Sequence, residues 1–91
     1  MVLGVDPAYR TGCKLAVVDQ TGKVLHIDKV FITLPKDNYD KDIKTLLDII
    51  SKYKIEIIAI GNGTASRESE AFIAKLIQEH HLNVEFAIIF L

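Results

Sequence analysis

Hydrophobic and polar positions divide the chain into seven segments of regular structure. Two stretches place apolar residues three and four apart, as on one face of a helix, from Asp40 to Lys54 and from about residue 64 to about His81. Five runs have the length and composition of β-strands, at residues 1–6, 15–18, 24–34, 55–60 and 84–91. The order strand-strand-strand-helix-strand-helix-strand predicts an α/β layer fold, with a hairpin supplying an antiparallel strand.

The same patterns predict which residues face the core. In the third strand the apolar positions alternate with polar ones, which predicts one buried face and a bulge near Asp28, and Pro35 ends the strand. The run at residues 55–60 is continuous and β-branched, which is typical of a central parallel strand covered on both faces. The predicted inward positions of the third strand and the two helices are Leu25, Ile27, Val30, Ile32, Leu34, Ile43, Leu46, Leu47, Ile50, Ile73, Leu76, Ile77 and His80.

Composition restricts the class of protein. The 91 residues fit one domain, which we expect to span residues 1–91. The formal net charge of −1 gives no overall attraction to nucleic acid, so such a contact must come from a local patch. Cys13 is the only cysteine, which excludes an internal disulfide and fits a reducing compartment. No apolar run is long enough for a leader or a membrane span, and we expect a cytoplasmic protein with no membrane partner.

The last strand ends in an uninterrupted apolar run, residues 86–91. An open apolar edge is unusual for a complete domain. We therefore expect either self-association through this strand or further structure, from the same gene or another chain, that covers it.

The first strand delivers a single carboxylate, Asp6, to its own end. Pro7 cannot donate a ladder hydrogen bond and Gly12 permits a left-handed turn, so the chain should reverse between them, in a loop that carries Arg10 and Lys14. Asp6 is a candidate metal ligand, and the alternative is that it accepts backbone N–H bonds from the loop.

A second candidate site lies between residues 61 and 68. Glycines between a strand and a helix bring backbone N–H groups close to an anion, and Asn62, Thr64, Ser66 and Arg67 could contact a phosphate. The alternative is an ordinary tight turn in which Thr64 or Ser66 caps the helix.

Two stretches carry a family resemblance: LGVDPAYRTGCKLAVVD from Leu3 to Asp19 and IAIGNGTASRE from Ile58 to Glu68. They resemble the YqgF domain of the Tex transcription accessory proteins, a ribonuclease H-like domain related to the YqgF and RuvC Holliday-junction resolvases. The resemblance implies a five-stranded sheet in the order 3-2-1-4-5 with strand 2 antiparallel. It also implies that this chain is a fragment, truncated at its C-terminus, of a longer protein with helical and S1 domains. In this fold Arg10, Lys14 and Arg67 would share the edge of the sheet that carries Asp6.

The resemblance also bears on catalysis. Active resolvases of this fold use several carboxylates to hold two Mg²⁺ or Mn²⁺ ions. One further carboxylate lies at the tip of strand 4 and another on the last helix. Here strand 4 ends in Gly61 and Asn62, and Glu68 is the remaining acid that could approach Asp6. The leading hypothesis is therefore a nucleic-acid-associated module without nuclease activity of its own. The alternatives are a Mg²⁺- or Mn²⁺-dependent Holliday-junction-resolvase-like nuclease, and a nucleotide-binding module like the actin-type ATPases, which share the Gly-x-Asp start.

Overall fold

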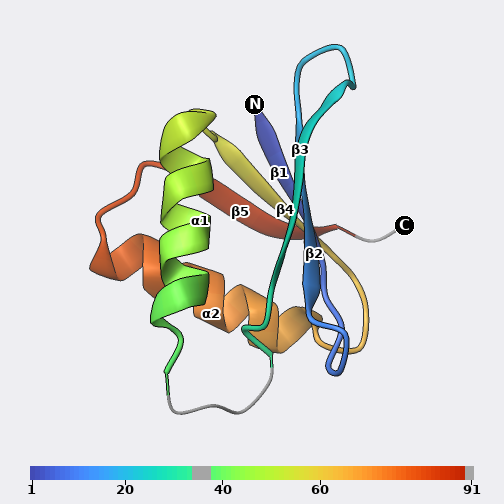
Figure 1. The fold of residues 1–91 in the computed structure, drawn as a ribbon, viewed down its shortest axis with the longest axis vertical. Coiled ribbons are helices and arrows are strands. Elements are labelled where there is room, and N and C mark those ends of the chain that lie inside the picture. The colour runs from blue at the N-terminus through green and yellow to red at the C-terminus, as the bar shows by residue number, and fades with distance from the viewer. Residues whose placement is uncertain (34–37, 90–91) are drawn as a thin grey trace.

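The seven predicted segments are present, with adjusted ends. The computed structural model describes residues 1–33 and 38–89 (Figure 1). The elements are β1 (Val2–Asp6), β2 (Cys13–Val18), β3 (Val24–Val30), α1 (Asp40–Lys52), β4 (Ile57–Gly61), α2 (Ser66–Glu79) and β5 (Glu85–Ile89). The domain is therefore α/β, as the hydrophobic pattern predicts. Within the described ranges, neither helix is both long and apolar enough to cross a bilayer.

The strands form one mixed sheet in the order β3-β2-β1-β4-β5. β2 runs antiparallel to both of its neighbours, β1 and β3, and β4 runs parallel to β1 and β5. This is the order implied by the resemblance to ribonuclease H-like domains, and the prediction is confirmed.

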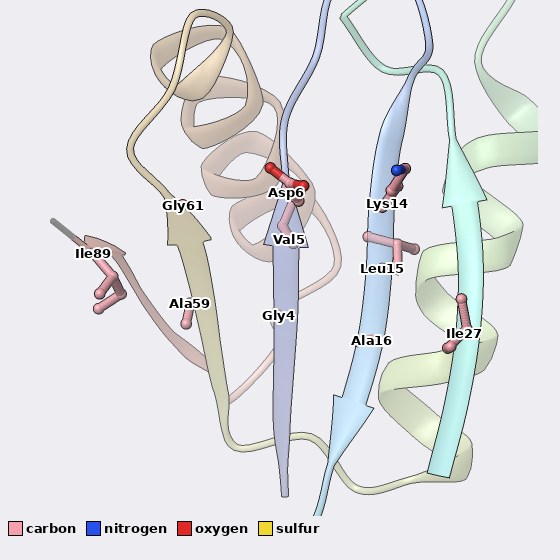
Figure 2. A pocket seen from close by; sticks show the side chains of 10 residues that line it. All are labelled: Gly4, Val5, Asp6, Lys14, Leu15, Ala16, Ile27, Ala59, Gly61 and Ile89. Atoms are coloured by element: carbon pink, nitrogen blue, oxygen red, sulfur yellow. The ribbon is translucent and has the colours of Figure 1, made fainter. Parts of the chain in front are cut away.

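Both helices lie on the same face of the sheet (Figures 1 and 2). β3, β4 and β5 are mutually parallel, and the connections through α1 and α2 both step across the sheet in the same direction. Right-handed crossovers in one direction place their helices on one face. The core between this face and the helices consists mainly of Leu3, Val5, Cys13, Leu15, Val17, Val30, Leu46, Ile49, Ile50, Ile58, Ile60, Ile73 and Leu76.

The prediction that residues 55–60 are covered on both faces is wrong. Ile58 and Ile60 are fully buried beneath the helices, whereas Ile57 is 46% exposed and Ala59 is only half-buried. The strand is central and parallel, but no element in the described part of the chain covers its second face. We call this uncovered side of the sheet the open face.

The third strand differs from its prediction in three respects. It ends at Val30, whereas the predicted end at Leu34 lies outside the described residues. The bulge lies at Leu25, which the pairing with β2 skips, and not near Asp28. Because no bulge separates them, Ile27 and Val30, three residues apart, face opposite sides: Val30 is buried and Ile27 is 73% exposed on the open face.

The two helices end in the same way. Each is followed by a residue in the left-handed region, Lys54 (φ 51°) or His81 (φ 52°). The next amide donates back into the last turn, from Ile55 to Ile50 O (3.0 Å) in α1 and from Leu82 to Ile77 O (3.0 Å) in α2. His80, predicted to face inward, is the exposed C-cap of α2, because the inward stripe ends with Leu76 and the half-buried Ile77.

Candidate functional site

The two sequence motifs meet at the carboxyl ends of β1 and β4. The strands are paired directly, and an added Cβ at Gly61 would lie 3.5 Å from Val5 O. The loops that follow also adjoin, since a Cβ at Gly63 would lie 3.9 Å from Pro7 O. We call this region the corner. It consists of the strand ends at Asp6 and Lys14, the loop 7–12, the turn 62–65 and the first turn of α2.

Asp6 is exposed at this corner, and its side chain lies on the open face. It stands directly opposite Lys14 in the antiparallel register, and Figure 2 shows the two side chains at the same end of the sheet. Across residues 1–33 and 38–89 its carboxylate accepts no hydrogen bond and makes no ion pair. The hypothesis that Asp6 caps its own loop is therefore wrong.

The loop 7–12 is held by other groups. Gly12 adopts a left-handed conformation (φ 81°), and Thr33 Oγ1 donates a hydrogen bond to Ala8 O at 2.6 Å. The hydroxyl of Tyr9 donates to Glu68 Oε1 on α2 at 3.0 Å. That hydrogen bond, with smaller contributions from desolvation and the charge of Glu68, raises the pKa of Tyr9 above its ordinary value. Glu68 is thus engaged by Tyr9, and the structure shows no link between Glu68 and Asp6.

A buried contact fixes the other end of the loop. Ser69 Oγ donates to Ala65 O at 2.9 Å, so its hydroxyl proton is already used. The thiol of Cys13 is therefore the donor in the 3.4 Å contact between Cys13 Sγ and Ser69 Oγ. Tyr9, inside the loop, and Cys13, directly after it, contact successive residues of α2 and so hold the loop against the helix. Cys13 is fully buried as the first residue of β2.

The residues of the predicted anion site lie in the turn before α2 and in its first turn. The N-cap is Ala65, and neither Thr64 nor Ser66 provides a side-chain cap, so the alternative in which one of them caps the helix is wrong. Ser66 is buried, whereas Asn62 and Thr64 are exposed. Two backbone amides of the turn are already bonded, Ser66 N to Gly63 O at 3.3 Å and Asn62 N to Ile89 O at 3.0 Å. These two amides are therefore not available to an anion.

The three cations expected at this edge of the sheet are exposed: Arg10, Lys14 and Arg67. Arg10 follows Tyr9 in the loop and Arg67 precedes Glu68 on α2, so the Tyr9–Glu68 hydrogen bond links the two segments that carry these arginines. Lys14 begins the next strand, beside Asp6. In the described ranges none of the three cations makes an ion pair. Their charges remain available to an external anion, although Asp6 offsets part of the charge of Lys14.

The donor set does not fit the metal site of a resolvase. Two ions bridged by a scissile phosphate need several converging carboxylates. Among the residues that the structure describes, no group of three or more His, Cys, Asp or Glu side chains is close enough to hold an ion. Within this part of the chain, the Mg²⁺ or Mn²⁺ that the nuclease alternative requires therefore has no matching set of ligands.

Sequence comparison identifies the family of the chain. Residues 1–90 match the family of the Tex protein YqgF-like domain. The chain belongs to this family. It is 47% identical over 88 residues to YdcI of Bacillus subtilis, covering 97% of this chain and 12% of that protein. It is 46% identical over 76 residues to the transcriptional accessory protein Tex of Neisseria gonorrhoeae, covering 84% of this chain and 10% of that protein.

A human relative is more distant. The S1 RNA-binding domain-containing protein 1 is 39% identical over 92 aligned positions, which cover 97% of this chain and 9% of that protein. The YqgF-like domain described here thus spans about a tenth of the length of these relatives. Asp6, Glu68 and the cations of the corner all lie within the matched residues 1–90.

Proposed function

We propose that this YqgF-like domain is the nucleic-acid-contacting module of a Tex-type transcription accessory protein, and that it does not cleave phosphodiester bonds itself. The observation that carries the proposal is the corner at the ends of β1 and β4. Its three exposed cations make no ion pair within residues 1–33 and 38–89, and one of them, Lys14, lies beside the carboxylate of Asp6. The free, buried thiol of Cys13 supports a location in the reducing cytoplasm.

The cations favour contact with a phosphate backbone. Two side-chain contacts hold the corner that carries the exposed Arg10, Lys14 and Arg67, so its backbone loses little further conformational freedom on binding a strand. Three phosphate contacts on duplex DNA correspond to a slope of about −2.7 in log affinity against log salt. We therefore expect weak, salt-sensitive binding without base specificity. The names of the relatives, which include a transcriptional accessory protein and an S1 RNA-binding protein, support a nucleic-acid partner.

The carboxylates favour binding over cleavage. In the fold to which the chain is similar, metal-assisted hydrolysis places acids around the tip of the first strand. Here the neighbouring tip is Gly61, and the nearest helical acid, Glu68, accepts the hydrogen bond from Tyr9. A single exposed Asp6 can repel or orient a phosphate, but it cannot assemble a two-metal centre.

The binding test is the salt dependence of affinity for single-stranded RNA, duplex DNA and branched DNA. Arg67→Ala should weaken binding to each and make the salt slope shallower by about one unit. Lys44→Ala, which removes an exposed lysine of α1, is the control for net charge and should leave the slope unchanged. Equal affinities and equal salt slopes for the two variants would show that the corner is not part of the binding surface.

The cleavage test uses the same nucleic acids with Mg²⁺ or Mn²⁺ added. We expect no product above background from the wild-type chain. Cleavage that is lost in Asp6→Asn would overturn this part of the proposal and favour the resolvase-like alternative. Because Asp6 is exposed and has no hydrogen-bond partner among the described residues, the substitution should leave the fold intact.

A further inference from the structure

The turn between β4 and α2 contains an asparagine followed by a glycine, Asn62 and Gly63. The side-chain amide of an asparagine can be attacked by the backbone nitrogen of the next residue, and a side chain on that residue obstructs the attack. Glycine has no side chain and adopts the widest range of backbone angles. In the sequence Asn38 precedes tyrosine and Asn83 precedes valine, so Asn62 is the asparagine most open to this reaction.

The structure leaves both reacting groups accessible. Asn62 is exposed, and within residues 1–33 and 38–89 its side-chain amide makes no hydrogen bond. The backbone nitrogen of Gly63 likewise has no acceptor in these ranges, although two other amides of the turn are bonded. Among the described residues, therefore, no hydrogen bond to either group has to break before they react.

We propose that Asn62 is a site of spontaneous deamidation, and that the carboxylate formed there weakens the contact between the corner and nucleic acid. In the first step the nitrogen of Gly63 forms a bond to Cγ of Asn62. The side-chain nitrogen leaves as ammonia and takes the proton of the Gly63 amide with it. In the second step water opens the cyclic imide by breaking one of its ring C–N bonds, which gives an aspartate or an isoaspartate. The new acid ionises and its proton passes to the ammonia, so water replaces ammonia with no oxidation or reduction.

The new carboxylate changes the charge balance of the corner. Asn62 directly follows Gly61, which lies at the end of the strand next to that of Asp6 (Figure 2). The corner holds more cations than carboxylates, and its charged side chains are Arg10, Lys14, Arg67, Asp6 and Glu68. One further carboxylate cancels the excess positive charge, so the attraction to a phosphate backbone falls. This effect rests on the proposed contact with nucleic acid, whereas the deamidation itself does not.

The deamidation is tested by peptide mass spectrometry after the chain has been kept in warm, mildly alkaline buffer. The peptide with Asn62 should gain the mass of one deamidation about tenfold faster, or more, than the peptide with Asn83. Asn83 is also exposed, but the β-branched valine that follows it obstructs the attack. Equal rates at the two asparagines would overturn the proposal.

Gly63→Ala is the matched variant for the attacking residue. An added Cβ would lie 3.9 Å from Pro7 O, an ordinary contact, and Gly63 does not adopt a left-handed conformation. The variant should therefore keep the fold while its side chain obstructs the attack. We expect the mass gain at position 62 to slow to the rate measured at Asn83.

The effect on binding is tested with Asn62→Asp, which carries the product charge from the start, and with Asn62→Gln, which keeps an amide. Asn62→Asp should weaken the binding of single-stranded RNA and duplex DNA by about twofold to sixfold at low salt, the effect of one charge about 4–8 Å from a phosphate in water. The loss should shrink as salt is added, because salt screens exposed charges. Asn62→Gln should bind like the wild-type chain. Both variants should fold, since the side chain of Asn62 is exposed.

The two proposals fail in different ways. Equal binding by Asn62→Asp and Asn62→Gln, with weaker binding by Arg67→Ala, would overturn the inference about position 62 and leave the proposed function standing. No effect of Arg67→Ala either would show that the proposed contact with nucleic acid is itself wrong, and its control by Asn62 would fall with it. Wild-type chain that has deamidated during incubation should bind like Asn62→Asp, whereas incubated Gly63→Ala should keep its initial affinity.

Discussion

Replacing Gly12 by alanine tests how tightly the loop 7–12 is packed against β3. Gly12 has φ 81°, and a Cβ built on it would lie 2.8 Å from Val30 O and 2.8 Å from Phe31 Cδ1. The ring of Phe31 is partly exposed and can move aside. Val30 O cannot, because it belongs to the backbone of the residue paired with Cys13 in the sheet. Alanine therefore meets both a disfavoured backbone conformation and a fixed obstacle.

Gly22 in the β2–β3 hairpin separates the two costs. Its φ is 87°, but an added Cβ would have nothing within 4 Å. Gly22→Ala should therefore cost only the left-handed conformation, about 1 kcal/mol. Gly12→Ala adds overpacking, typically about 1–3 kcal/mol, for a total of about 2–4 kcal/mol. The difference between the two variants gives the steric cost at Gly12.

The assay is urea unfolding followed by far-ultraviolet circular dichroism. A domain of this size has about 5–14 kcal/mol of stability, so both variants should still fold. In a parallel thermal scan each kcal/mol lowers the midpoint by about 4–8 °C. Equal losses at the two glycines, with unchanged urea slopes, would contradict the packing described for the loop.

Three further predictions concern the helix ends, the loop and the core. Lys54→Gly and His81→Gly should each stabilise the domain by about 0.5–1 kcal/mol in urea unfolding, because glycine adopts the left-handed C′ position without strain; a loss in both would contradict this. Tyr9→Phe should destabilise the domain near pH 7. Since the acceptor carboxylate raises the Tyr9 pKa, the contribution is present below the unfolded pKa of about 10 and is lost as pH rises through the higher folded value, so the two proteins should converge in urea unfolding at high pH. Ile58→Ala should cost about 2–5 kcal/mol and Ile57→Ala less than about 1 kcal/mol, since only Ile58 is buried; similar costs would show that the open face is covered.

The sequence predicts the order of the elements well, because each depends on local spacing. It fails where a decision depends on the whole sheet. The continuous run around Ile58 correctly indicates a central strand, but covering on both faces depends on where the helices pack. That is decided by the direction and handedness of the crossovers, which no window of the sequence contains.

The error in β3 has a different cause. Ile27 and Val30 can share a face only if a bulge lies between them, and the sequence allows a bulge at several positions. In the structure it falls at Leu25, next to the hairpin turn, where pairing with Val18 resumes at Val24. The position is set by how the turn closes, with Asp19 N donating to Lys23 O, and not by the alternation itself.

The candidate site divides in the same way. A carboxylate at the strand end and nearby cations can be read from residues 6–14 alone. The contacts that order them cannot, because Tyr9 and Glu68 are separated by 59 residues and Cys13 and Ser69 by 56. Both pairs depend on the rotation of α2 about its axis, which only packing against the sheet determines. Ser69 carries no sequence signal of its role other than its place one turn into a helix.

The corner and the open face share one boundary, at Asp6 and Lys14. Both side chains point to the open face, whereas Arg10 and Arg67 belong to the loop and to α2 beyond the end of the sheet. We expect Arg67→Ala to make the salt slope of nucleic-acid binding shallower by about one unit. Lys14→Ala should change the slope by less, because the neighbouring carboxylate of Asp6 offsets part of the charge of Lys14. An equal change of slope in the two variants would show that Asp6 does not weaken the contact that Lys14 makes with phosphate.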